Sequence, residues 1–128
     1  MKEGKHIQIG MMKIMPIFDI PAWDEVEERF GSIDEALEKL KGGKGWRKAT
    51  IAMTTILCSR TLVLTGDKPL DERTVEKLMP TRYAMDAKTA CVQAIAKGLR
   101  MDYKDKQEES ERIDLVLREI EKKEEPAE

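Results

Sequence analysis

The stretch WRKATIAMTTILCSRTLVL runs from Trp46 to Leu64 and is the most apolar part of the chain. It is apolar on nearly every face, and a helix of that kind is usually surrounded by other helices. Most of its large side chains recur at spacings of three and four residues: Trp46, Ala49, Met53, Ile56, Leu57 and Leu64. We therefore predict that this stretch is the central helix of a bundle, ended by a turn at residues 65–69. Its Arg60 and its hydroxyl groups argue against a membrane span, which needs about 20 apolar residues.

Two short amphipathic helices are predicted before the central helix. Pro21 opens the first, because its fixed φ suits the first helical turn, and Gly31 ends it. Ser32 and Glu35 form a capping box that opens the second, which ends at Gly42. The apolar positions are Trp23, Val26 and Phe30 in the first helix and Ile33, Ala36, Leu37 and Leu40 in the second.

Two further helices are predicted after the central one. Asp71 caps a short helix over residues 72–79, and Pro80 breaks it. Thr81 caps the next helix, which continues to about Leu99. The face of this helix holds many small residues, which allow a close approach to the central helix: Tyr83, Ala87, Ala90, Cys91, Ala94, Ile95 and Leu99.

Both ends of the chain differ from this helical middle. Residues 1–18 are predicted to be extended, because residues 6–9 alternate polar and apolar side chains as a half-buried strand does. Such a strand needs a partner, either in a small hairpin or in another subunit. Residues 104–128 hold six basic and ten acidic residues, a net charge of −4, whereas the rest of the chain carries +2.

A thin apolar seam runs along this charged C-terminal segment: Ile113, Val116, Leu117 and Ile120. The spacing predicts an amphipathic helix that packs on the parent domain or is offered to another subunit or partner. The seam is the partner-binding candidate of the sequence. The predicted fold is mainly α, a compact bundle of four to five helices with a short N-terminal β-strand or hairpin. It divides into a helical domain over residues 1–103 and a charged amphipathic helix over residues 104–128.

Length and composition exclude several classes of protein. The 128 residues fit one domain, and 38% of them are charged. With 23 basic and 25 acidic residues the net charge is −2, which argues against a strongly basic nucleic-acid-binding protein. One His and two Cys are too few for a zinc cage, so neither a metal nor a cofactor is expected.

The cysteines and the N-terminus bear on the compartment. Cys58 and Cys91 lie in apolar helical patterns, so we interpret them as reduced core thiols of a cytosolic protein, with a disulfide staple as the alternative. The N-terminal region has no continuous apolar run, because Pro16, Asp19 and Pro21 interrupt it. A signal peptide is therefore not expected.

No catalytic residue is predicted. His6 has no neighbouring nucleophile or orienting carboxylate in the sequence. The loop GGKG at residues 42–45 lacks the spacing of a phosphate loop and is interpreted as a flexible connector. Carboxylate pairs at helical spacing are interpreted as solvated faces: Asp24 with Glu28, Asp34 with Glu38, and Glu72 with Glu76.

Four cations gather around Trp46, and we call them the basic cluster: Lys41, Lys44, Arg47 and Lys48. Cations beside an aromatic ring are found in sites for single-stranded nucleic acid. A patch for an acidic protein partner fits equally well, and a solvated helix start is the preferred interpretation. The cluster therefore leaves open a small nucleic-acid-binding regulator as an alternative function.

The order of segments resembles a known family. FDIPAW at residues 18–23 leads into an acidic helix, RFGSIDEAL follows at residues 29–37, and the apolar helix, the turn and the small-residue helix come next. This pattern, over about residues 14–100, resembles the small tail assembly chaperones of long-tailed phages and prophages of Gram-positive bacteria. The resemblance implies a mostly helical, self-associating, non-enzymatic protein of the bacterial host cytoplasm. It also implies binding of the tape measure protein before the tail tube polymerises around it. A structural head–tail connector protein is a further alternative.

Overall fold

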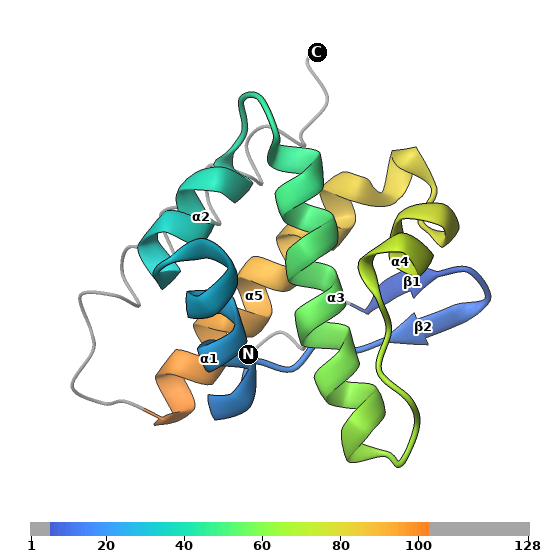
Figure 1. The fold of residues 1–128 in the computed structure, drawn as a ribbon, viewed down its shortest axis with the longest axis horizontal. Coiled ribbons are helices and arrows are strands. Elements are labelled where there is room, and N and C mark those ends of the chain that lie inside the picture. The colour runs from blue at the N-terminus through green and yellow to red at the C-terminus, as the bar shows by residue number, and fades with distance from the viewer. Residues whose placement is uncertain (1–5, 103–128) are drawn as a thin grey trace.

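The central helix forms with the bounds that the sequence predicts, as α3 (Trp46–Leu64). The structure is a computed structural model, and it describes residues 6–102 of the chain. The fold is mainly α, as predicted, with a small sheet at the N-terminal end (Figure 1). The remaining elements are β1 (Ile7–Ile9), β2 (Met12–Ile14), α1 (Ile20–Phe30), α2 (Ile33–Lys41), α4 (Glu72–Leu78), the 3-10 turn η1 (Thr81–Tyr83) and α5 (Ala84–Asp102).

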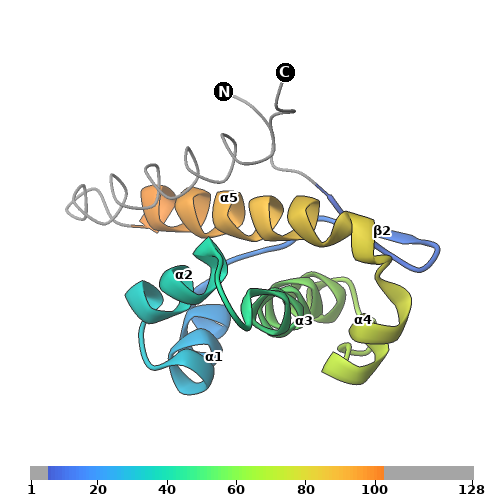
Figure 2. The ribbon, with the colours of Figure 1, turned by 90° about the horizontal axis from the view of Figure 1, so that it is seen from above.

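The helices form two layers. Figure 2 shows α5 lying across one side of the domain, with α1, α2, α3 and α4 side by side beneath it. Helix α3 packs against α5 and also against α1, α2 and α4, so it is the hub of the bundle. This arrangement explains why its middle is apolar on all faces, since every residue from Ala49 to Cys58 except the half-buried Ile51 is buried.

The core lies between α3 and the other elements. Its fully buried side chains include Met53 and Leu57 of α3, with Ile95 and Leu99 of α5. The predicted small-residue face of α5 is confirmed, because Ala87, Ala90 and Cys91 are all buried. One prediction for α3 is wrong: Leu64, assigned to the packed side, is 59% exposed because the last turn extends beyond its neighbours.

The extended start of the chain forms a hairpin within one molecule. Strands β1 and β2 pair antiparallel, with Ile7 opposite Ile14 and Ile9 opposite Met12. Gly10 takes a positive φ of 59° in the turn, a conformation that favours glycine. Ile7 and Ile9 are buried and β1 packs on α5, which confirms the alternation predicted for residues 6–9.

Side-chain caps fix three helix starts. Oδ1 of Asp19 accepts the Ala22 N–H of α1 at 3.1 Å, and Oγ of Ser32 accepts the Glu35 N–H of α2 at 3.0 Å. Asp71 caps α4 by accepting the Thr74 N–H at 2.8 Å, as predicted. The prediction that Thr81 caps the last helix is wrong. Residue 81 begins η1 instead, and α5 follows at Ala84.

A glycine lets the chain cross α5 closely. A Cβ at Gly98 would collide with the carbonyl oxygen of Phe18, in the segment that leads from the hairpin to α1. That segment is also tied to α3, since the Ile17 N–H donates to the Leu57 carbonyl at 3.2 Å and the Thr61 hydroxyl donates to the Met15 carbonyl. The N-terminal segment is thus held between the two layers.

The two cysteines are free and buried, which confirms their interpretation as core thiols. Among residues 6–102, no helix is long and apolar enough to cross a membrane. The predicted C-terminal helix over residues 104–128 lies outside the described residues.

Candidate functional site

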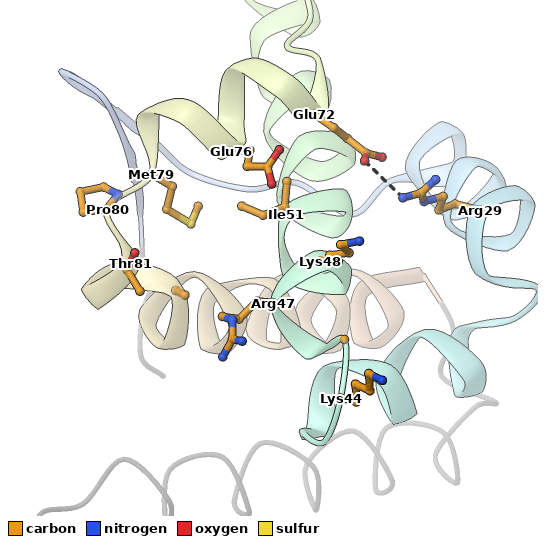
Figure 3. A pocket seen from close by; sticks show the side chains of 12 residues that line it. Arg29, Lys44, Arg47, Lys48, Ile51, Glu72, Glu76, Met79, Pro80 and Thr81 are labelled. Atoms are coloured by element: carbon orange, nitrogen blue, oxygen red, sulfur yellow. Dashed lines mark hydrogen bonds and ion pairs between the residues drawn. The ribbon is translucent and has the colours of Figure 1, made fainter.

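A charged groove lies beside the N-terminal half of α3, and it is the candidate site. It has a volume of about 770 Å³ and opens to solvent between α3 on one side and α4, η1 and the start of α5 on the other (Figure 3). Its apolar lining comes from both sides: Ile51, Met79, Pro80 and Ala84. Its volume lies in the range of ligand sites, about 300–1,000 Å³.

The loop between α2 and α3 places the cations of one wall. Gly43 and Gly45 have φ values of 81° and 90°, so the chain turns sharply on both sides of Lys44. Gly45 is the N-cap of α3, and Arg47 and Lys48 follow in the first helical turn. Figure 3 shows Lys44, Arg47 and Lys48 on this wall and Glu72 and Glu76 on the other.

An ion pair bridges the groove at one end. Nη2 of Arg29, on α1, lies 3.2 Å from Oε2 of Glu72, on α4. Both side chains are about half exposed, at 51% and 46%, so the pair contributes about 0–1 kcal/mol to folding. The pair joins two helices that are far apart in the sequence.

The other groove cations have no such partner. Within residues 6–102, no carboxylate lies in ion-pair range of Lys44, Arg47 or Lys48. Besides Glu72, one further carboxylate lines the groove, that of Glu76 on α4. The α3 wall is therefore positively charged in a protein whose net charge is −2.

The basic cluster predicted from the sequence is divided by the structure. Lys44, Arg47 and Lys48 line the groove, whereas Lys41 pairs with Glu38 on α2 at 3.7 Å. Lys44, Arg47 and Lys48 are all exposed at the start of α3, which agrees with the preferred interpretation of a solvated helix start, and they also line one wall of the groove.

The ring of Trp46 is already in contact with cations of the protein itself. The Arg47 guanidinium lies 5.7 Å from the ring centroid, and the Lys88 ammonium, on α5, lies 4.4 Å from it. Lys88 is 2% exposed, so this contact belongs to the packing between α3 and α5. A nucleic-acid base that stacked on Trp46 would compete with these contacts.

The possible metal ligands and the two cysteine thiols are the other side chains of residues 6–102 that could carry chemistry. Residues 6–102 contain no group of three His, Cys, Asp or Glu side chains placed to hold a metal ion. Burial raises the pKa of the Cys91 thiol to about 12, and burial together with the nearby Cys91 raises the pKa of Cys58 further. Both thiols are therefore protonated at neutral pH and are poor nucleophiles. His6, which directly precedes β1, is exposed.

Sequence reasoning missed most of the groove. Arg29, Met79 and Pro80 carried no signal for a site, because each lies in an ordinary local pattern. The basic cluster beside a glycine-rich loop was one signal, and the pair of Glu72 and Glu76 was a second, but that pair was interpreted as a solvated face. The predicted partner-binding seam of Ile113, Val116, Leu117 and Ile120 lies outside the described residues.

Comparison with known proteins adds no relative. No protein-family model, no curated protein and no solved structure matches the chain.

Proposed function

We propose that this protein is a non-enzymatic chaperone that holds a segment of another protein in the groove beside α3. One observation carries the proposal: the groove combines an apolar lining with a positive wall whose cations have no ion-pair partner among the described residues. Exposed cations are solvated by water, so leaving them without an ion-pair partner costs little free energy. They can attract a partner of opposite charge and disfavour one of like charge.

The lining favours a protein segment over a small metabolite. The groove opens to solvent and is lined by residues of α1, α3, α4, η1 and α5 and of the α2–α3 loop, so an extended ligand contacts more of it than a compact one. The half-buried Ile51 supplies apolar surface to the groove, with smaller contributions from the buried Met79 and Ala84, and an amphipathic helix packs on surface of this kind. Met79 adds adaptability, because its side chain is flexible and polarisable.

The identity of the client is inferred from the resemblance of the chain to tail assembly chaperones. We propose that the client is the tape measure protein of a phage or prophage tail, bound in the bacterial cytoplasm before the tail tube forms. A tape measure protein is long and helical, so its apolar faces need cover until assembly. Self-association of the chaperone, checked by light scattering, is part of this proposal.

The test is co-expression with a tape measure protein of such a phage. We expect the client to be largely insoluble alone and soluble with the full chain. The matched comparison is a chain in which Ile51 and Met79 are both changed to Lys, with its folding checked by circular dichroism. Equal client solubility with and without the chain would exclude the chaperone function.

A nucleic-acid-binding regulator is the second candidate, and the free cations Lys44, Arg47 and Lys48 favour it. Against it, Glu72 and Glu76 line the same groove and repel phosphate. Binding of DNA or RNA that falls steeply with salt would favour this candidate. A head–tail connector would differ from a chaperone by remaining in the finished particle, which mass spectrometry of purified particles detects.

A further inference from the structure

We propose that the groove takes an amphipathic α-helix with one acidic flank, and that the acidic flank lies along the α3 wall. This inference rests on the proposed function and adds to it the chemistry of the bound segment. It follows from three features of the groove: the positive charge of the α3 wall, the apolar lining between the walls and the negative charge of the opposite wall.

The first feature is the excess of positive charge on one wall. The Arg29 guanidinium is already paired with Glu72 across one end of the groove. Beyond the paired Glu72, the groove is lined by a single further carboxylate, that of Glu76, whereas three further cations line it: Lys44, Arg47 and Lys48. A ligand with carboxylates at this wall would give three cations the partners that they lack within residues 6–102.

The second feature is the apolar lining between the walls. Met79 and Ala84 are each 8% exposed, and Ile51 is half-buried. Figure 3 shows Ile51 and Met79 from opposite sides of the groove, between the acidic and the basic side chains. A helix places apolar side chains along one stripe and charged ones beside it, which matches an apolar strip flanked by charge.

The third feature is the opposite sign of the second wall. Glu76 lies on α4 and faces the groove, so a ligand that is acidic all round meets repulsion there. A helix with acidic residues on one flank and basic residues on the other satisfies both walls. The same argument disfavours a nucleic-acid backbone, which is negative on every side.

The experiment uses the full chain and three probes. The first is a designed helical peptide of about 20 residues with a Leu stripe, Glu on one flank and Lys and Gln on the other, with excess Glu. The second has the same length and stripe with Glu and Lys exchanged throughout. The third is a single-stranded DNA oligonucleotide. Each probe carries a fluorescent label, and binding is followed by anisotropy at fixed salt.

The variants separate the groove from the rest of the surface. Arg47→Glu/Lys48→Glu reverses the basic wall. Lys68→Glu/Lys97→Glu makes the same change in net charge at two exposed lysines that do not line the groove. Glu76→Lys removes the acid of the opposite wall. Circular dichroism and thermal unfolding confirm that each variant is folded.

We expect the Glu-rich peptide to bind wild type about tenfold more tightly than the Lys-rich peptide. Arg47→Glu/Lys48→Glu should lower the affinity for the Glu-rich peptide about tenfold, and Lys68→Glu/Lys97→Glu should change that affinity less than twofold. Glu76→Lys should strengthen its binding. In a Trp23→Phe background, binding should also change the fluorescence of Trp46, because Arg47 lies over its ring.

Four results would overturn the inference. The first is equal binding of the two peptides, and the second is equal weakening by both charge-reversed pairs. The third is tighter binding of DNA than of the Glu-rich peptide, with competition between them. The fourth is tighter, groove-dependent binding of a synthetic peptide of residues 104–128, which would assign the groove to the chain's own acidic segment. If the client stays soluble while no peptide binds, this inference fails and the proposed function stands.

Discussion

The two ends of α3 use their cations in opposite ways. At the C-terminal end, the Arg60 guanidinium donates to both carboxylate oxygens of Asp19 at 2.9 to 3.1 Å, and its side chain is only 18% exposed. At the N-terminal end, Arg47 and Lys48 line an open groove, with no ion-pair partner among residues 6–102. One end therefore fixes the fold, and the other leaves its charge available.

The comparison separates the charges that stabilise the fold from those that do not. Asp19 is also the N-cap of α1, so one carboxylate organises the start of α1 and ties it to α3. Loss of this carboxylate leaves a shielded guanidinium without its partner, which costs more than the pair itself contributes. Arg47 and Lys48 are exposed and have no ion-pair partner among residues 6–102, and the contact of Arg47 with the Trp46 ring is worth about 0.5 kcal/mol at an exposed site. Their substitution should therefore change binding far more than folding.

The largest effect is expected at the fixed end. Asp19→Ala removes the cap of α1 and the partner of Arg60, and we expect the free energy of unfolding to fall by about 2–3 kcal/mol. Asp19→Asn keeps a capping side chain and removes the charge, so it should cost about half as much. Urea denaturation measures both. Equal losses for the two variants would show that the cap adds nothing beyond the ion pair.

Because of the same carboxylate, the free energy of unfolding should depend on pH in the acidic range. Partial burial raises the pKa of Asp19, but the hydrogen bonds from Arg60 and from the Ala22 N–H outweigh it, so the pKa lies below its ordinary value of 3.8. The ionised form is thus favoured in the folded state. Its contribution is complete above pH 3.8 and is lost as the pH falls through the lower folded pKa.

Comparison of wild type with Asp19→Asn isolates this effect from other titrating groups. The difference in unfolding free energy between the two proteins should be constant near neutral pH and shrink as the pH falls below 3.8. Thermal unfolding across that range measures it. A difference that does not change with pH would contradict the assignment.

A smaller effect is expected at the bridge across the groove. Glu72→Gln removes the exposed ion pair with Arg29, and the free energy of unfolding should fall by about 0.5 kcal/mol or less. The same variant should weaken repulsion of an acidic ligand and also free Arg29 to bind it. The affinity for the Glu-rich peptide, measured by anisotropy, should therefore rise. A lower affinity would contradict the orientation proposed for the acidic flank of the ligand.

The fold was predictable because its signals are local. Asp71, Ser32 and Pro21 start their helices through contacts within one turn, and the alternation of residues 6–9 marks the hairpin strand. Thr81 was assigned wrongly because it begins the η1 turn, which has no side-chain cap and is closed by the backbone hydrogen bond from the Tyr83 N–H to the Pro80 carbonyl.

The groove was not predictable in the same way. Its walls come from α1, the α2–α3 loop, α3 and the region from α4 to α5, and only tertiary packing brings them together. Lys88 contacts Trp46 through the crossing of α5 over α3, which no spacing in the sequence encodes. The basic cluster marked one wall, whereas the Glu72 and Glu76 pair of the opposite wall was interpreted as a solvated face.

The central claim is that the cations beside the groove serve binding and not folding. One paired measurement on Arg47→Glu/Lys48→Glu tests it most directly: the free energy of unfolding in urea and the affinity for the Glu-rich peptide. We predict stability within about 0.5 kcal/mol of wild type and affinity reduced about tenfold. A loss of stability as large as that of Asp19→Ala, or an unchanged affinity, would contradict the claim.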